Sequence, residues 1–343
     1  MGRRLVFSAI VMLICAPVSK GAGKEDAGGT LGIYLENDLF ADTDQYYTSG
    51  FKLSWSSYDL EQLSDSPYAN PLLPIFNVLP YINEANYQKN LVFSLGQNIY
   101  TPANTDTEQL IKDDRPYAGW LYLGVGVVWK DADVRNSLVL NLGVVGPWSQ
   151  AQGTQRLIHD LRGFDHPNGW DHQLDNEIAF DLAYERIWRW PKHDRRSGMD
   201  WELLPHAGAT VGTVSTFANA GAEVRLGFNL PDDFGTSSIG PAATTSTPVD
   251  GMLGANRSSI DIGAYLFARV DGRAVARNIF LDGNTFSNSH SVNSLPFVAD
   301  LSVGAAANYQ NTKLAYAFVY RTMEFKGQED EQILGTISLN WAF

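Results

Sequence analysis

The sequence is nearly free of cysteine, since Cys15 is the only one among 343 residues. Disulfide bonds are therefore excluded as a source of stability, even if the chain is exported to an oxidising compartment. A lipid anchor on Cys15 is an alternative use of this residue. The preceding Ile14 is larger than the small residue usual before a lipidated cysteine, which argues against the anchor.

Long hydrophobic runs are also scarce. One lies near the start of the chain, from Leu5 to Ala16, directly after Arg3 and Arg4. A positively charged start before an apolar stretch too short for a stop-transfer helix is typical of a secretory signal.

We therefore expect a signal peptide over residues 1–22, cleaved near Gly21 or Ala22, and a mature domain over 23–343. No later segment is long and apolar enough to suggest a transmembrane helix.

Positive charge is in short supply, with 25 Lys and Arg against 38 Asp and Glu and a net charge of −13. This balance argues against nucleic acid as a partner. Carboxylates gather in segments expected to be loops, where solvent or divalent cations can neutralise them. They are Asp42, Asp44, Asp113, Asp114, Asp165, Asp171 and Asp175.

Several catalytic motifs are missing. The chain has no Gly-x-Ser-x-Gly nucleophile elbow, no His-Glu-x-x-His zinc motif and no phosphate-binding P-loop. Covalent serine catalysis is therefore not supported.

Alternation at period two is abundant instead. In the last segment, apolar side chains at every second position from Ile333 to Phe343 alternate with small or polar ones. A transmembrane barrel strand shows this pattern because one face meets lipid and the other the lumen. The aromatic ending resembles an outer-membrane assembly signal, so we expect the assembly machinery to be a partner.

The same test predicts about twelve strands, an even number as in bacterial barrels. They are expected at 28–37, 46–58, 88–101, 118–130, 134–147, 175–190, 201–213, 219–229, 258–271, 295–308, 312–324 and 332–343. The predicted fold is an all-β, single antiparallel transmembrane β-barrel with one short helix in an extracellular loop.

The lengths of the connections between strands suggest which end of the barrel faces the periplasm and which faces the exterior. We expect tight periplasmic turns, such as 131–133, and longer external loops at 59–87, 148–174, 230–257 and 272–294. Tryptophans near strand ends suit girdles at the membrane interfaces. These are Trp55, Trp120, Trp129, Trp188, Trp190, Trp201 and Trp341.

The short helix is expected between Thr154 and Gly163. Thr154 can cap its start, residues 155–161 lack helix breakers, and Gly163 can end it. A spacing of four places Gln155 and His159 on one face, while the leucines can lie against the barrel or the membrane surface.

The first candidate site joins two strands. Asn37 and Asp38 end the first strand, and Thr48 lies at the start of the second, which should be its hairpin neighbour. Carboxylate, amide and hydroxyl oxygens suit a hard cation such as calcium. Simple turn chemistry is the alternative for an Asn-Asp pair before a loop.

The second candidate site is Gln155 with His159. A neutral imidazole there can take a proton from water while the amide orients a polar group. Other histidines compete for the role of base, namely His166, His172, His193, His206 and His290.

The third segment, Asp113 to Trp120, has a structural interpretation. Arg115 can pair with a carboxylate, and Pro116 fixes the entry to the next strand.

Taken together, a series of short motifs resembles the outer-membrane lipid A 3′-O-deacylase family. The motifs are Asn37-Asp38, Tyr47-Thr48-Ser49-Gly50, Ile99-Tyr100-Thr101-Pro102, Asp114-Arg115-Pro116-Tyr117, Gly146-Pro147, Gln155-x-x-x-His159 and Gly169-Trp170-Asp171-His172-Gln173. The most specific of them lie between residues 31 and 177.

The resemblance implies a twelve-stranded barrel in the outer membrane that hydrolyses the 3′-linked acyloxyacyl ester of lipid A, in the lipopolysaccharide of the outer leaflet, with calcium (Ca²⁺). The implied site residues are His159 as the base, with Gln155 and Asn37, and Asp38 and Thr48 near the metal. A non-enzymatic barrel, acting as pore or scaffold, and a phospholipase-type barrel are the alternatives.

One family residue has no counterpart. Characterised members carry a catalytic lysine in the loop after the third strand, whereas residues 101–114 here contain only Lys112, beside Asp113 and out of register.

Overall fold

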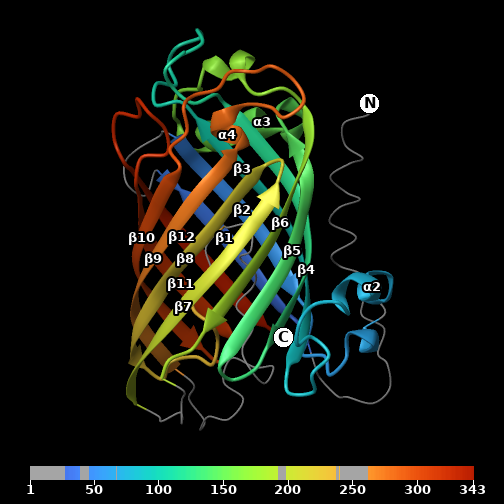
Figure 1. Ribbon diagram of the computed structural model, residues 1–343. Helices are drawn as coiled ribbons and strands as arrows, with labels where there is room; N and C mark the ends of the chain where they lie inside the picture. Colours follow the sequence, from blue (N-terminus) through green and yellow to red (C-terminus); the bar gives the residue numbers. More distant parts are fainter. Residues whose placement is uncertain (1–27, 39–45, 67, 192–197, 237–238, 240–261) are drawn as a thin grey trace.

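The computed structural model describes residues 28–38, 46–66, 68–191, 198–236, 239 and 262–343 (Figure 1). Within them twelve antiparallel strands close into one barrel, in which each strand pairs with its chain neighbours and β1 pairs with β12. The expected signal peptide lies outside the described residues. No helix in the described part of the chain has the length and apolar character needed to cross a membrane.

The strands are β1 (Thr30–Asn37), β2 (Tyr46–Ser56), β3 (Gln88–Thr101), β4 (Ala118–Lys130), β5 (Val134–Val145), β6 (Glu177–Trp188), β7 (Met199–Gly212), β8 (Ser215–Phe228), β9 (Ile262–Asn278), β10 (Phe297–Tyr309), β11 (Thr312–Arg321) and β12 (Gln332–Ala342). The helices are α2 (Leu73–Phe76), α3 (Ala151–Arg162) and α4 (Ile279–Asp282), with 3-10 turns η2 (Leu63–Asp65), η3 (Asn70–Leu72), η4 (Pro147–Ser149) and η5 (Gly169–His172).

The predicted fold class is confirmed, and every predicted strand overlaps an observed one. Strand β9 continues to Asn278, beyond the predicted end at residue 271. The apolar alternation breaks there at Asp271, Arg273 and Arg277, but these side chains line the lumen. Charged residues that face a polar lumen are compatible with a barrel strand.

The assignment of long loops to one end is wrong. We call the end where β1 stops and β2 begins the upper end, and the opposite end the lower end (Figure 1). The connections after β2 and β8 start at the lower end, where the turn 131–133 lies, while the two-residue β7–β8 turn lies at the upper end. Loop length alone does not determine the side because long segments can fold against or into the barrel.

The segment after β8 folds into the lumen. Asp233 pairs with Arg225 Nη1 of β8 at 2.5 Å and with Lys313 Nζ of β11 at 2.6 Å, on two strands of the lower barrel wall. Further along, the Ile239 backbone N–H donates to Glu36 Oε1 at 2.6 Å, near the upper end of β1. The described residues of this segment therefore contact the wall both in the lower lumen and near the upper end of β1.

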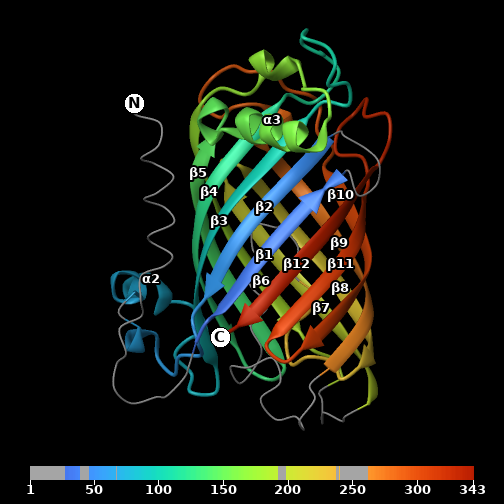
Figure 2. The same cartoon turned by 180° about the vertical axis from the view of Figure 1, so that it is seen from behind.

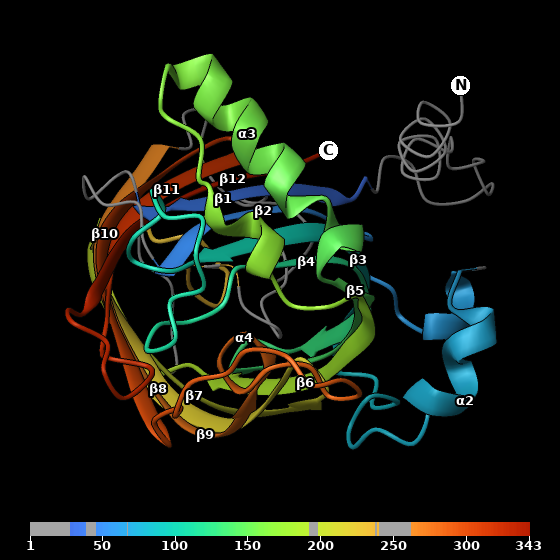
Figure 3. The ribbon, with the colours of Figure 1, turned by 90° about the horizontal axis from the view of Figure 1, so that it is seen from above.

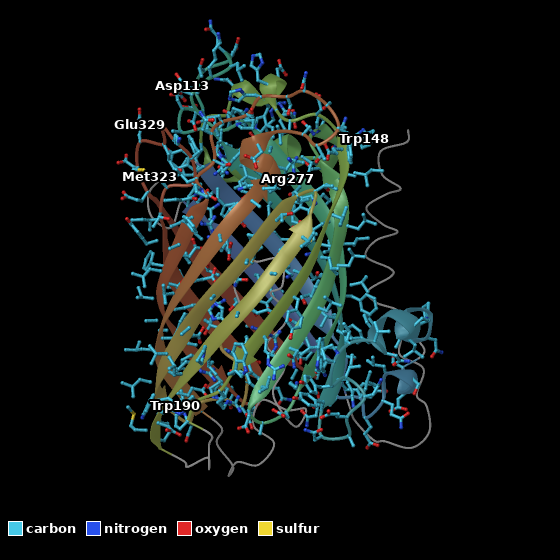
Figure 4. All side chains as sticks on the ribbon, in the orientation of Figure 1. Asp113, Trp148, Trp190, Arg277, Met323 and Glu329 are labelled. Atoms are coloured by element: carbon cyan, nitrogen blue, oxygen red, sulfur yellow. The ribbon has the colours of Figure 1, made fainter. Side chains whose placement is uncertain are left out.

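The outer wall carries the expected apolar side chains, and Trp188, Trp190, Trp201 and Trp341 are exposed there. Figure 4 labels Trp190 at the lower end and Trp148 at the upper end. Two tryptophans depart from the girdle prediction because they are buried. Trp120 stacks on Tyr122 beside the lumen, and Trp129 is covered by the connection after β2.

Candidate functional site at the upper end

The β1–β2 hairpin forms as predicted and places Asn37 beside the start of β2. Asn37 is paired across the two strands with Ser49, the chain neighbour of Thr48. Asp38 follows directly and is fully buried. A buried carboxylate demands compensation by a cation or by hydrogen bonds.

Thr48 is displaced from the regular ladder. The pairing of β2 with β3 shifts register between Tyr47 and Ser49, which leaves Thr48 as the extra residue of a β-bulge. Its Oγ1 lies 2.8 Å from Oγ1 of Thr101, at the end of β3, and both residues are buried. At this bulge the Thr48 hydroxyl therefore contacts the neighbouring strand β3.

Helix α3 lies across the upper ends of β2, β3 and β4 (Figure 2) and runs along one side of the barrel wall (Figure 3). It starts one turn earlier than predicted, because Thr154 donates its backbone N–H to Gln150 as an interior residue. It ends at Gly163, whose φ of 73° is left-handed, as predicted. Gly119 on β4 permits the close approach, since a Cβ there would clash with Ser149 and Ala151.

Gln155 points from α3 into the protein and is held by Trp170. The indole Nε1 donates to Gln155 Oε1 at 2.9 Å, and both side chains are buried. Trp170 in turn packs on Tyr117, with ring centroids 5.0 Å apart. Gln155 Nε2 is buried and has no hydrogen-bond partner among the described residues.

We predict that Trp170→Phe loosens this arrangement. The change keeps the ring but removes the donor, so the buried Gln155 oxygen loses its partner at a cost of about 1–3 kcal/mol. Amide hydrogen exchange over residues 151–162 should become faster. Trp148→Phe, at an exposed tryptophan of the same loop, is the matched control and should leave the exchange unchanged; equal rates in both variants would contradict the role of Trp170.

His159 lies on the same buried face of α3, one turn after Gln155. Its Nδ1 lies 2.6 Å from the carbonyl oxygen of Asp165. A carbonyl can only accept, so Nδ1 carries a proton, and in the neutral form of the ring Nε2 is the nitrogen with the lone pair. Phe164 meets the ring edge-on at 5.9 Å and fixes its orientation.

The other histidines of the described chain have different surroundings. His166 is exposed and pairs with Asp160, His206 bonds Asp271 inside the barrel, and His290 lies 2.7 Å from the Asp114 carbonyl. His172 is exposed, and His193 lies outside the described residues. Among them His159 alone shares a buried helix face with a glutamine.

The third segment is structural, as predicted. Arg115 is buried, pairs with Glu324 at 3.2 Å and lies over the Tyr100 ring. Burial by itself would raise the pKa of Glu324, but Arg115 and Arg321 together hold it below its ordinary value. Lys112 is exposed and does not join this group.

A cavity of about 230 Å³ lies inside the barrel. Its lining includes Tyr47, Tyr100, Trp120 and Asp181, while α4 contributes Phe280, stacked 3.9 Å from Tyr100. Thr48, Asp38, Gln155 and His159 do not line it. The candidate residues and this lumenal cavity are therefore separate places.

The candidate residues at the upper end form two groups. Asn37, Asp38 and Thr48 come from the β1–β2 hairpin, and Gln155 and His159 come from α3, which lies across neighbouring strand ends (Figure 2). Among the described residues no cluster of three or more His, Cys, Asp or Glu is suited to a metal. A cation here would need hydroxyl, amide or carbonyl oxygens beside the Asp38 carboxylate, which is a donor set that calcium accepts.

Sequence reasoning missed two supporting groups. Trp170 belongs to one of the motifs named above, but the sequence does not indicate which residue its indole contacts. The Asp165 contact is made by a backbone carbonyl, which any residue type would supply. Both act across the loop between β5 and β6, so no local spacing would reveal them.

A closed, twelve-stranded antiparallel barrel with an apolar outer wall and a charged lumen is an outer-membrane protein. The family model described as outer membrane protein LpxR matches residues 5–343. The chain belongs to the LpxR family.

Structural comparison agrees on the fold. The chain is similar to LpxR from Salmonella typhimurium, with a TM-score of 0.71 at 20% identity, covering 92% of this chain and 100% of that one. It also matches the beta domain of the Bordetella autotransporter BrkA, with a TM-score of 0.46 at 11% identity, covering 93% of this chain and 100% of that one. No curated protein sequence matches the chain.

Proposed function

We propose that this protein is a calcium-dependent lipid A deacylase that hydrolyses the 3′-linked acyloxyacyl ester in the outer leaflet. Membership of the LpxR family and the barrel fold support the general class. The observation that supports the chemistry is the Nδ1 contact of His159 with the Asp165 carbonyl, which favours the neutral tautomer whose Nε2 can accept a proton.

The proposed reaction needs no covalent intermediate. His159 Nε2 takes a proton from water, and the water oxygen attacks the ester carbonyl to form a tetrahedral oxyanion. Collapse breaks the bond to the sugar oxygen, which takes the proton back from His159 as the fatty acid is released. The Gln155 Nε2 donor and the Asn37 amide would orient substrate oxygens.

Asp38 and Thr48 would hold the calcium ion. When bound there, the cation supplies positive charge that stabilises the oxyanion. Oxygen donors and a fully buried carboxylate fit such an ion. Since Lys112 is exposed, the charge of this metal is more important here than in relatives that carry a lysine.

A pore is a weaker interpretation. A passive channel needs an open lumen, whereas Asp233, Thr236 and Ile239 here bond to lumen-facing side chains of the wall.

Asp38→Asn tests the metal proposal because it keeps the shape and removes the charge. We expect calcium binding by the purified protein, measured calorimetrically, to be lost and hydrolysis to fall about 10²–10³-fold. Chelation of calcium should have the same effect on the unchanged protein. Asp165→Asn is the matched control, because that exposed side chain plays no part in the proposal and only its backbone carbonyl does. Unchanged calcium affinity in Asp38→Asn would contradict the metal assignment.

A further inference from the structure

The connection between β2 and β3, residues 57–87, forms a small structure outside the barrel at its lower end (Figures 1 and 3). We call it the β2–β3 excursion. It contains η2, η3 and α2 and has a core of its own, which packs on the outward side chains of β3 and β4. That core comprises Leu60, Leu63, Ala69, Phe76, Ile82 and Tyr87 with Leu91, Val127 and Trp129 of the wall.

The excursion lies directly below the lipid-facing belt. Along the outer face of β4, Leu123 is 53% exposed, whereas Val127 and Trp129, two and three steps further down the same face, are fully buried under the excursion. Phe93 of β3 and Leu138 of β5 are half-buried against its edge. The excursion therefore continues a wall whose upper part faces lipid.

Its sequence is unusual for a loop in water. No charged residue occurs between Asp65 and Glu84, a stretch rich in leucine, isoleucine, proline and tyrosine. Buried positions explain part of this composition, but Val78 is 78% exposed and Tyr81 is 51% exposed. Exposed apolar side chains grouped in one segment indicate a surface that meets a membrane or a partner.

A tyrosine of this segment joins the tryptophan girdle. The Arg186 guanidinium on β6 lies 5.8 Å from the centre of the Tyr81 ring and 5.6 Å from that of Trp188. Tyrosine, tryptophan and arginine favour the headgroup level of a membrane, where a ring and a charge can both be accommodated. Tyr81 therefore lies at the same level as the interfacial aromatic residues of the barrel.

The other part of the excursion is polar. Glu61, Ser64, Asp65 and Glu84 are exposed, and acidic side chains avoid the surface of anionic lipids. The excursion thus has a charge-free part and an acidic part.

We propose that the charge-free part of the β2–β3 excursion, with Val78 and Tyr81 at its surface, rests in the headgroup region of the membrane at the lower end of the barrel. The excursion thereby acts as an interfacial foot on one side of the barrel. Lipid is favoured over a protein partner because the surface is continuous with the lipid-facing wall and the girdle. The proposal depends on the barrel and not on the deacylase activity.

Cysteine labelling can test this because Cys15 is the only native cysteine. In a Cys15→Ser background, Val78→Cys would carry an environment-sensitive fluorophore in phosphatidylethanolamine–phosphatidylglycerol nanodiscs, where both membrane faces are reachable. Leu123→Cys serves as the lipid-facing reference and Ser64→Cys as the aqueous reference within the same excursion. Tyr81→Cys replaces Val78→Cys if that variant does not fold.

The expected result is a blue-shifted emission at position 78, quenched by shallow nitroxide lipids at least as strongly as position 123 and shielded from iodide. Quenching by iodide as at position 64 would overturn the proposal by placing the segment in water. Shielding from both quenchers would also overturn it, because protein rather than lipid would then cover the position.

Discussion

Replacing His159 by alanine is expected to lower ester hydrolysis about 10²–10⁴-fold while the barrel remains folded. The change removes the basic Nε2 that the Asp165 carbonyl prepares by binding Nδ1–H. It should not disturb the sheet, because α3 lies on the strand ends and contributes no strand pairing. Hydrolysis of lipid A by the purified protein and the heat-modifiable mobility of the barrel measure the two effects separately.

His166→Ala is the matched control for this prediction. His166 belongs to the same loop but is exposed and pairs with Asp160, so its loss should leave hydrolysis unchanged. Full activity in His159→Ala, or an equal loss in both variants, would contradict the assignment of His159 as the base.

Replacing Asp233 by alanine is expected to lower the free energy of unfolding by about 3–5 kcal/mol. Asp233 is fully buried and pairs with Arg225 and Lys313, and its backbone oxygen accepts from Arg189. Without this carboxylate, the buried charges of Arg225 and Lys313 lose a negative partner. Among the described residues, Arg225 then retains only Glu202 as an ion-pair partner. Urea unfolding in lipid vesicles would measure the loss.

The neighbouring Asp232→Ala is the control for Asp233→Ala. Asp232 also pairs with an arginine, Arg189, at 2.9 Å, but its side chain is partly exposed, so water compensates much of the loss. A stability of Asp233→Ala equal to that of Asp232→Ala would show that the lumenal segment is not held by this ion pair.

The barrel could be predicted from the sequence because every strand has one face toward lipid and one toward the lumen. Outward positions must be apolar and inward ones need not be, so β3 and β4 were predicted to the residue. The end of β9 was missed for the same reason, since Arg273 and Arg277 face inward and their charges obscure the pattern.

The placement of loops could not be predicted from length. The described residues of 59–87 pack on the outer wall, whereas Asp233, Thr236 and Ile239 bond to lumen-facing side chains. Both arrangements depend on contacts distant in sequence. Trp129 shows the consequence, because its alternation indicated a lipid-facing residue whereas the connection after β2 covers it.

The candidate site was predicted in part. The pairing of Asn37 with the start of β2 follows from hairpin geometry, and the shared face of Gln155 and His159 follows from helical spacing. The Trp170 donor and the Asp165 carbonyl could not be predicted. Both lie in the loop after α3, which folds back on the helix, and no sequence spacing indicates such a contact.

The proposed deacylase activity can be measured by mass spectrometry of lipid A from cells that express this protein, beside cells that express the His159→Ala variant. Lipid A should lose its 3′-acyloxyacyl group only with the unchanged protein and only when calcium is present. Intact lipid A in both strains, with the protein folded in the outer membrane and an active deacylase as positive control, would contradict the proposed activity.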